Sequence, residues 1–290
     1  MKKQLLLLTI MLISVTMQGQ GSKTVTDLSP GGLITELTSA ELTSVTNLTL
    51  SGTIDARDFF QIREKITRLA VIDLTNVTVA AYTGTEGAQS GELLTFPANA
   101  LPGGAFIAMA NLTAVTLPAT ITSIGNGSFQ NNGKLSFINI PSSLTSIGVN
   151  AFRNCKLLTA LSIPASVVSI GANAFTESAI QVSVAAENLQ YSSADGVLFN
   201  KDQSLLMYWP ASKSGSYIIP STVKNISDYA FFSCAGLTSV TIPQSVTAIG
   251  NWVFSRCSGL LSVNIPNSVT SIGECAFMDC SSLASIDIPK

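Results

Sequence analysis

Residues 237–250 read Leu-Thr-Ser-Val-Thr-Ile-Pro-Gln-Ser-Val-Thr-Ala-Ile-Gly, and this stretch decides the fold. Val240 and Ile242 are apolar and alternate with a polar residue, as expected of a half-buried β-strand. Proline has no backbone N–H to donate to a sheet, so Pro243 ends the strand. The ring of Phe254, a few residues further on, is predicted to fill the interior of a coil.

The same pattern recurs along most of the chain in steps of 23 residues, with one longer step of 56. An aliphatic residue followed by proline occurs at Leu117-Pro118, Ile140-Pro141, Ile163-Pro164, Ile219-Pro220, Ile242-Pro243, Ile265-Pro266 and Ile288-Pro289. Phenylalanine follows the same spacing at Phe106, Phe129, Phe152, Phe175, Phe231, Phe254 and Phe277. Because independent ladders share one period, the chain is predicted to be a repeat array.

A single unit cannot bury its apolar edge alone, whereas stacked units bury a continuous core as a solenoid. Each strand is therefore predicted to pair with the strand of the next unit at about 4.8 Å. A glycine follows the second apolar edge in most units, as in Ile249-Gly250, and Ser227 replaces it once. This glycine is expected to permit a sharp turn.

The N-terminal part carries a variant of the pattern. Residues 45–50 and 69–74 both show the strand spacing, and residues 55–66 between them show helical spacing of apolar residues. Asp55 and Asp58 stand where the helix begins, and the helix dipole favours acids there. Residues 21–95 are therefore predicted to form a strand-helix-strand cap with a loop.

The loop of this cap is placed at residues 75–95. Residues 83–91 read Thr-Gly-Thr-Glu-Gly-Ala-Gln-Ser-Gly, which is the composition of a flexible connection.

The first residues have the pattern of a targeting segment. Lys2 and Lys3 precede an apolar run that ends in Gly19-Gln20-Gly21, which is typical of a bacterial secretory signal peptide with cleavage near residue 20. An uncleaved membrane anchor is the alternative. No other stretch holds 18 consecutive apolar residues, so the mature chain is expected to be exported and soluble, without membrane insertion after cleavage.

The 56-residue step marks an irregular unit at residues 179–219. Residues 197–209 are predicted to form a β-hairpin that turns at residues 200–204. Tyr208 and Trp209 belong to the densest aromatic group in the chain. These aromatic residues are either the core of an enlarged unit or a protruding contact site.

The repeated unit, as in residues 237–250 with Phe254 and Cys257, resembles the BspA-type leucine-rich repeats of bacterial surface proteins. Residues 196–202 and 208–210 look like an inserted unit that is common in that family. The resemblance covers about residues 96–290. It implies an α/β solenoid of leucine-rich repeats, in units of about 23 residues, mostly β-strand with short convex turns or helices.

The same resemblance implies a secreted, periplasmic or cell-surface protein that binds other molecules. Some members of the family are implicated in adhesion to host matrix proteins or to other cells, and partner identity varies within it. The predicted function is therefore recognition or adhesion, with a protein or glycan partner. The sequence ends at Ile288-Pro289-Lys290 without a recognisable capping unit, so docking or self-association through the last repeat is an alternative.

Cysteine is repeated at one position of the unit, which Asn132 and Ser178 occupy in other repeats. The four residues are Cys155, Cys234, Cys257 and Cys280. They are interpreted as buried free thiols that satisfy backbone groups. The alternative is a disulfide between neighbouring units or with Cys275, which an export compartment would allow. A zinc site is disfavoured because the spacing has no Cys-x2-Cys pair and the chain has no histidine.

Composition excludes several classes of function. Without histidine there is no Ser-His-Asp triad and no His-ligated metal. A net charge of −2 gives no electrostatic footprint for nucleic acid. No nucleotide-binding glycine motif is present, so no cofactor is expected. A glycosidase needs only two carboxylates, and the candidates are Asp55, Asp58, Glu64, Glu177, Asp195, Asp202 and Asp228. None forms a pair in matching register, so the chain is predicted not to be an enzyme.

The remaining candidate is the outward face of the strands, a nearly uncharged surface of hydroxyls and amides. Such a face either simply solvates the sheet or recognises a partner, as the extended concave faces of solenoids do. The candidate partner-binding residues are Phe137, Asn139, Ser239, Thr241, Ser262 and Asn264, with Tyr208 and Trp209 from the hairpin.

Overall fold

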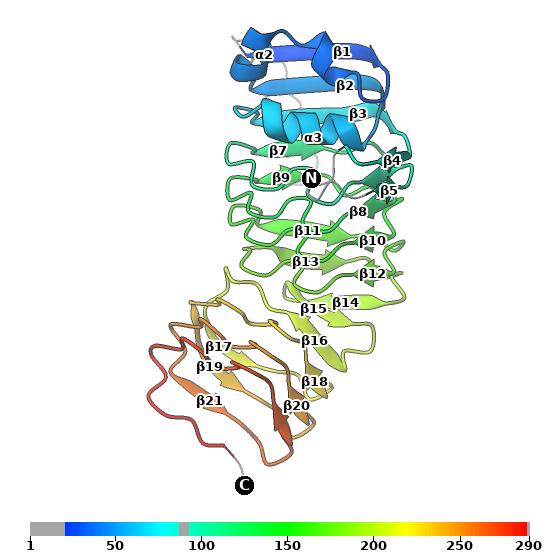
Figure 1. Ribbon diagram of the computed structural model, residues 1–290. Helices are drawn as coiled ribbons and strands as arrows, with labels where there is room; N and C mark the ends of the chain where they lie inside the picture. The colour runs from blue at the N-terminus through cyan, green and yellow to red at the C-terminus, as the bar shows by residue number, and fades with distance from the viewer. Residues whose placement is uncertain (1–20, 87–92, 289–290) are drawn as a thin grey trace, which may run out of the picture.

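The computed structural model describes residues 21–86 and 93–288. These residues form a solenoid of stacked coils that runs from the N-terminal cap to the last repeats (Figure 1). The predicted signal peptide, residues 1–20, lies outside the described residues.

Each coil contributes one strand to a first row, which consists of three separate sheets of parallel strands. The strands of this row are β1 (Ser22–Leu28), β2 (Asn47–Ile54), β3 (Val71–Val79), β7 (Ala114–Thr116), β9 (Phe137–Ile138), β11 (Ala160–Ile163), β13 (Gln181–Val184), β17 (Gly215–Ile218), β19 (Leu237–Thr241) and β21 (Ser262–Asn264). The period is visible in the register, because Ala114 pairs with Phe137 and Ser239 with Ser262. The outward side of these strands is called the sheet face below.

A second row of short strands follows the proline-containing corner of each coil. Its members before the irregular unit are β6 (Ala100–Leu101), β8 (Ser123–Ile124), β10 (Ser146–Ile147) and β12 (Ser169–Ile170). Its members after it are β18 (Asn225–Ile226), β20 (Ala248–Ile249) and β22 (Ser271–Ile272), joined to β14 (Tyr191–Ala194), β15 (Val197–Asn200) and β16 (Leu205–Tyr208). The chain then returns to the first row through a turn that contains the repeated phenylalanine.

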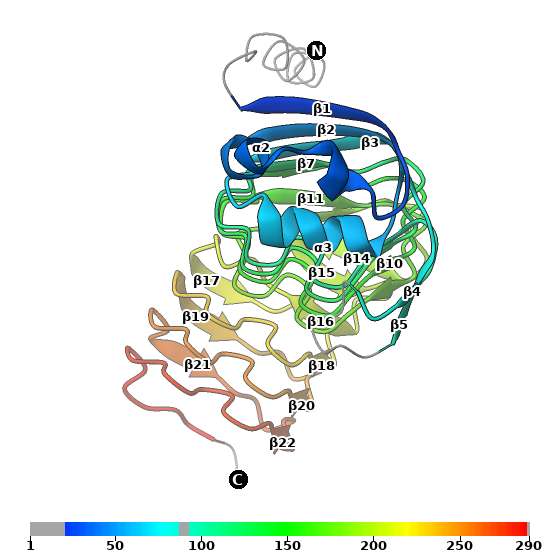
Figure 2. The same ribbon diagram turned by 45° about the horizontal axis from the view of Figure 1, so that its top comes forward.

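The N-terminal cap contains the predicted strand-helix-strand unit, in which α3 (Ala56–Lys65) connects β2 and β3. Figure 2 shows α3 covering the side of the solenoid on which the other coils have turns. Asp55 accepts the backbone N–H of Arg57, and the Asp58 carboxylate accepts the N–H of Asp55, which together cap the helix. The sequence did not reveal β1, the 3-10 helix η1 (Leu33–Glu36) or α2 (Ser39–Ser44).

The expectation of a loop over residues 75–95 was wrong in part. Strand β3 continues to Val79, and β4 (Tyr82–Gly84) pairs antiparallel with β5 (Leu94–Phe96). Residues 87–92, which belong to the predicted loop, lie outside the described residues. Threonine, tyrosine and phenylalanine favour strands, and this preference outweighed the neighbouring glycines.

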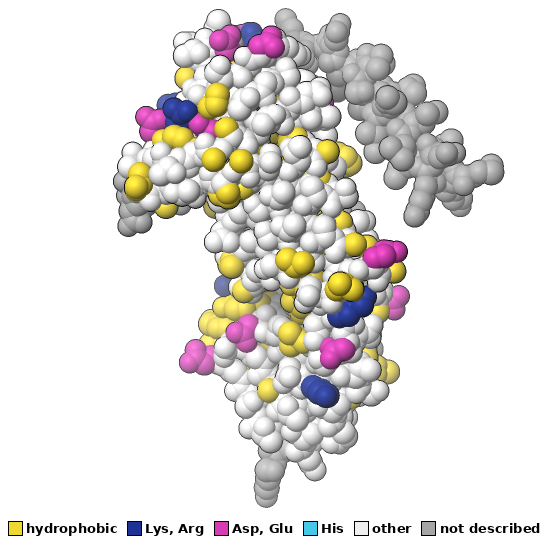
Figure 3. Space-filling view, turned by 90° about the vertical axis from the view of Figure 1, so that its right-hand side faces the viewer, with side chains coloured by type: hydrophobic (Ala, Val, Ile, Leu, Met, Phe, Trp, Pro, Cys, Tyr) yellow, Lys and Arg dark blue, Asp and Glu magenta, His cyan; other side chains and the backbone are white. Residues whose placement is uncertain are grey.

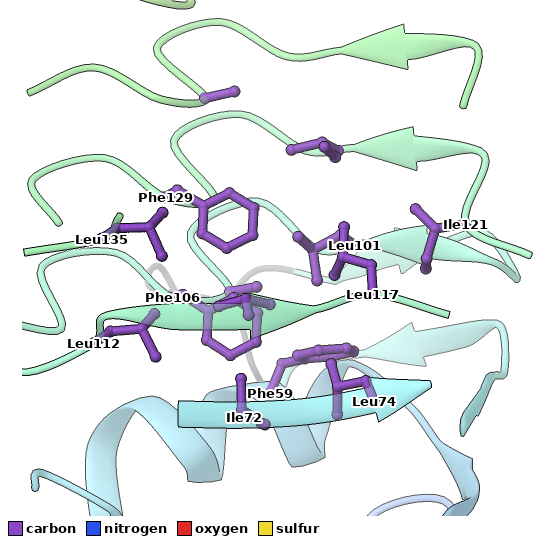
Figure 4. Packing of buried hydrophobic residues seen from close by; sticks show 14 of the residues in the cluster. Phe59, Ile72, Leu74, Leu101, Phe106, Leu112, Leu117, Ile121, Phe129 and Leu135 are labelled. Atoms are coloured by element: carbon purple, nitrogen blue, oxygen red, sulfur yellow. The ribbon is translucent and has the colours of Figure 1, made fainter. Parts of the chain in front are cut away.

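The core is a stack of phenylalanine rings, one from each coil. The rings of Phe129 and Phe152 lie 5.2 Å apart at an interplanar angle of 5°, and Phe106 and Phe129 lie 5.4 Å apart. Figure 4 shows Phe106 and Phe129 one above the other, with leucine and isoleucine side chains on both flanks. The prediction that phenylalanine fills each coil is confirmed.

The irregular unit divides the stack into two hydrophobic cores. Tyr208 closes the first core and lies 5.6 Å from Phe175, whereas Trp209 opens the second core and lies 5.8 Å from Phe231. The predicted hairpin is present as the antiparallel pair β15 and β16. The coils after it lean to one side of those before it (Figure 1). Residues 179–219 are called the break below.

The repeated glycine has a different reason from the expected one. A Cβ atom on Gly171 would lie 2.4 Å from the backbone nitrogen of Val149, and one on Gly273 would lie 2.5 Å from that of Asn251. Glycine therefore permits close approach of consecutive coils, and the turn itself does not need it. Ser227 replaces glycine in the coil that follows the break.

Candidate functional site

The sheet face presents short uncharged side chains in columns that follow the strand register. One column runs through Ala114, Phe137 and, on the next pair of strands, Ala160 and Gln181, the last of which lies at the start of the break. The corresponding column of the last sheet begins at Ser216, near the end of the break, and continues through Ser239 and Ser262. Within the described residues, the outward positions from β7 to β21 carry no ionisable side chain.

Phe137 and Asn139 both lie on the edge of the first sheet, but only one of them is available to a partner. The Phe137 ring is 39% exposed, which is unusual for an aromatic side chain on such a polar face. Asn139 is half-buried, and its carboxamide binds the backbone of the preceding coil. Its Oδ1 atom accepts the Leu117 N–H at 2.6 Å, and its Nδ2 atom donates to the Leu117 carbonyl at 3.0 Å. Asn139 is therefore a structural bridge between coils.

The candidates after the break lie together on β19 and β21. Ser239 donates to the Ser216 hydroxyl at 2.8 Å, so part of its hydrogen-bonding capacity is used within the face. Thr241, Ser262 and Asn264 are exposed. The structure thus places the candidates in two groups, Phe137 with Asn139 and the four residues of β19 and β21, on sheets that are not hydrogen-bonded to each other.

Ile218 is a residue of the sheet face that the sequence analysis missed. It pairs with Thr241 and is 74% exposed. A signal was present, because aligning Ile219-Pro220 with Ile242-Pro243 puts Ile218 in the register of Thr241. The sequence analysis overlooked Ile218 because the residues that precede it, in the irregular unit, lack the leucine of the regular repeat.

Tyr208 and Trp209 are not a contact site, which corrects their assignment as candidate partner-binding residues. Tyr208 is 5% exposed and Trp209 is 2% exposed. The Tyr208 hydroxyl donates to the Ser178 carbonyl at 2.8 Å. The two side chains replace the repeated phenylalanine where the break would otherwise leave both cores open, so packing accounts for the aromatic density.

The repeated cysteine position forms a ladder of hydrogen bonds inside the solenoid. Cys155 Sγ donates to the Phe129 carbonyl at 3.1 Å, and Cys257 Sγ donates to the Phe231 carbonyl at 3.0 Å. Asn132 and Ser178 make the same bond in their own coils, to Phe106 and Phe152. All five cysteines are free, and Cys275 alone is exposed.

Burial also makes the thiols of this ladder unreactive. It raises the pKa of Cys155 and of Cys257 to about 12. The pKa of the buried Cys234 thiol is raised for the same reason. A thiol rather than a thiolate is therefore present at neutral pH, and only the thiolate attacks or binds a metal.

The carboxylates considered for hydrolysis have structural partners. The buried Asp58 accepts the N–H groups of Gly31 and Leu33, and burial raises its pKa. Five of the other acids have a salt-bridge or hydrogen-bond partner: Asp55 with Arg57, Glu64 with Arg63, Glu177 with Arg153, Asp228 with Asn251 and Asp202 with Ser204. Asp195 occupies the left-handed position of the turn between β14 and β15. These contacts explain the acids as caps, turns and bridges between coils.

A family profile described as "BspA type Leucine rich repeat region" matches six copies, over residues 95–201 and 210–290. The chain belongs to this family. The BspA-type match omits residues 202–209, which form the turn and second strand of the hairpin. The predicted leucine-rich-repeat solenoid is thereby confirmed.

Solved structures with this fold come from several bacteria. A leucine-rich cell surface protein from Faecalibacterium prausnitzii has a TM-score of 0.68 and 26% identity, over 93% of this BspA-type chain and 67% of that protein. A leucine-rich repeat protein from Eubacterium ventriosum has a TM-score of 0.64 and 26% identity, over 83% and 67% of the two chains. The pneumococcal vaccine antigen PcpA has a TM-score of 0.66 at 23% identity, over 85% and 62%, and supports the fold alone.

The BspA-type chain therefore spans 62% to 67% of the length of these proteins. A search of curated proteins finds no match. None of the helices in residues 21–86 and 93–288 combines the length and the apolar character that crossing a bilayer requires.

Proposed function

We propose that this BspA-type chain is an exported, non-enzymatic recognition or adhesion protein that binds a protein or glycan through its sheet face. The observation that carries the proposal is the pairing of an uncharged face with exposed apolar side chains. Phe137 is 39% exposed and Ile218 is 74% exposed, on strands whose other outward residues are mostly small hydroxyl-bearing or amide side chains.

Solvation alone does not require large apolar side chains on this face. Large apolar side chains on a polar face serve as anchors of an interface, and Phe137 and Ile218 provide one on each of two sheets. Figure 3 shows that charge is also sparse on the neighbouring side of the molecule, where charged side chains form a few separate groups. Recognition would therefore rest on shape and neutral hydrogen bonds, and the affinity would depend only weakly on salt.

One relative supports a location outside the cell. The Faecalibacterium prausnitzii protein is described as a cell surface protein. A signal peptide at residues 1–20 accounts for export in this proposal. Self-association through the last repeat stays a prediction, and the molar mass of the mature protein in solution tests it.

The experiment is a binding screen with the mature protein against immobilised host extracellular-matrix proteins and a glycan array. Phe137→Ala, Ser239→Glu and Thr241→Glu are then measured against each captured partner. We expect at least one of them to weaken binding by about tenfold or more, the loss typical of a central interface residue.

A matched control is Thr247→Glu, which changes the same residue type in the same coil but beside β20 in the second row. This variant should bind as the unchanged protein does. The proposal fails if all three sheet-face variants retain full affinity for every partner found.

A further inference from the structure

The break interrupts the hydrogen bonds that tie the turn of one coil to the turn of the next. In regular coils the N–H of the repeated phenylalanine donates to the following coil, as Phe152 does to the Ala174 carbonyl at 2.7 Å and Phe231 to the Val253 carbonyl at 3.0 Å. Within the described residues, the N–H of Phe175 makes no such bond. The turn that contains Phe175 therefore lacks this hydrogen bond to the next turn.

Hollows open where these bonds are missing. One hollow of about 250 Å³ lies between Phe175 and Tyr208 and reaches Ser227. A second hollow of about 240 Å³ adjoins it at Asn173 and Thr176, and Arg153, Tyr229, Trp252 and Arg256 line its mouth. Together they join the turns before the break to the turns after it, on the side of the solenoid that carries turns rather than on the sheet face.

The residues at this mouth occupy unusual backbone positions. Each turn holds two residues with left-handed backbone, and at the first of them the coils before the break place Gly104, Gly127, Asn150 and Asn173. The coils after the break place Tyr229 there with φ 59°, Trp252 with φ 58° and Cys275 with φ 52°. Glycine and asparagine tolerate this conformation, whereas a bulky side chain there is a true outlier.

The second left-handed position is more varied. It holds Ala108, Asn131, Asn154 and Glu177 before the break, and Ser233, Arg256 and Asp279 after it. Strained residues persist where the surrounding structure fixes them, and they gather at binding sites. Tyr229, Trp252, Glu177 and Arg256 thus bring aromatic and charged side chains to left-handed backbone positions at the mouth of the second hollow and its rim.

The side chains at this mouth form an ordered surface. The rings of Tyr229 and Trp252 are parallel to within 1°, with centroids 6.2 Å apart. The Arg256 guanidinium lies over the Phe232 ring, 5.5 Å from its centroid. A row of charges borders the rings, because Arg153 Nε lies 2.9 Å from Glu177 Oε2 and Arg256 Nη1 lies 3.9 Å from Glu177 Oε1.

The charges of this surface nearly balance. Glu177 faces both arginines, and Asp279 lies 3.9 Å from Arg256. The surface therefore has no strong field that would select an anion or a nucleic acid. What it offers is a stacked pair of half-buried aromatic rings beside planar guanidinium and carboxylate groups.

We propose that the mouth formed by Arg153, Tyr229, Trp252 and Arg256, with Glu177 at its rim, binds a neutral oligosaccharide. The C–H faces of pyranose rings pack against aromatic rings, and vicinal hydroxyls match guanidinium and carboxylate groups. This site is independent of the sheet face, and either can fail without the other.

The test measures binding of maltohexaose, cellohexaose, xylohexaose, mannohexaose and chitohexaose by titration calorimetry, with a sulfated heparin hexasaccharide as the charged comparator. Trp252 is one of two tryptophans, and the other, Trp209, is 2% exposed, so ligand at the mouth should also change the tryptophan fluorescence. We expect saturable binding of at least one neutral hexasaccharide with a Kd of about 1 mM or tighter.

The decisive variant is the double substitution Tyr229→Asn with Trp252→Asn, which installs the residue that Asn150 and Asn173 supply at the same position of earlier coils. It should keep the circular dichroism spectrum and melting temperature, because asparagine suits this backbone, and lower the affinity by about tenfold or more. Phe137→Ala, on the sheet face, should leave this affinity unchanged.

The proposal is overturned if no neutral hexasaccharide binds saturably, or if the folded double variant binds as tightly as the unchanged protein. Preference for the heparin hexasaccharide over every neutral one would also overturn it.

Discussion

Replacing Phe152 by alanine tests the aromatic stack on which the solenoid depends. The ring is fully buried between two others, with Phe129 at 5.2 Å and Phe175 at 6.0 Å. Truncation leaves a ring-sized cavity that the rigid coils on both sides cannot close.

The magnitude follows from two contributions. Truncating a buried phenylalanine to alanine lowers the free energy of unfolding by about 3–5 kcal/mol. Each stacked ring pair adds about 0.5–1.5 kcal/mol beyond the area it buries. Because Phe152 takes part in two such pairs, we expect a loss near the upper end, about 4–5 kcal/mol.

The assay is urea unfolding followed by far-ultraviolet circular dichroism, with Phe137→Ala as the matched control. That substitution removes the same ring from a position that is 39% exposed, and it should change the free energy of unfolding by no more than about 1 kcal/mol. A loss below about 1.5 kcal/mol for Phe152→Ala, or a loss equal to that of the control, would refute the stacked core.

Three further expectations concern single side chains. Cys155→Ser should change the free energy of unfolding by less than about 1 kcal/mol, because Ser178 makes the equivalent hydrogen bond in the next coil. Cys155→Ala leaves the Phe129 carbonyl without its donor, so it should lower the free energy of unfolding by about 1–3 kcal/mol in urea titrations. Equal losses for the two variants would contradict the hydrogen-bond ladder. Hydrogen bonds from Lys23 and Thr38 lower the pKa of Glu41 from 4.5 to about 2, so the stability they contribute is present above pH 4.5 and is lost as the pH falls toward 2. Glu41→Gln should remove this part of the acid dependence, and an unchanged pH profile of the melting temperature would count against it. A thiol reagent should modify one cysteine, Cys275, in the folded protein and all five after denaturation. Fast reaction of a second thiol in the folded state would contradict the burial of the other four cysteines.

The repeating part of the fold could be predicted because the same pattern of residues recurs in every regular coil. The spacing of phenylalanine and of the aliphatic residue before proline located the core and the corners, and the structure keeps that register from Phe106 to Phe175 and again from Phe231 to Phe277. The sequence also identified the glycine after the second apolar edge, but it did not reveal the structural role of this glycine. Its role is contact between coils, which a pattern within one coil does not contain.

The irregular parts could not be predicted to the same extent. Tyr208 and Trp209 were expected to be either the core of an enlarged unit or a contact site, and the structure shows that they close the two cores. The sequence could not decide between the two, because the 23-residue period does not define where the aromatic residue lies within the break. Asn139 looked like any other exposed amide, and only the neighbouring coil shows that its carboxamide binds Leu117. The aromatic residues Tyr229 and Trp252 are conspicuous only when the backbone reveals that their position is left-handed.

Hydroxyl-radical footprinting of the protein with a captured partner tests the central claim most directly, because it reports which side chains a partner covers. If the sheet face is the recognition surface, oxidation of Phe137 and Ile218 should fall by about tenfold in the complex, while oxidation of Cys275, on a turn of the other side, stays as in the free protein. Unchanged oxidation of both Phe137 and Ile218 in a saturated complex would contradict the account.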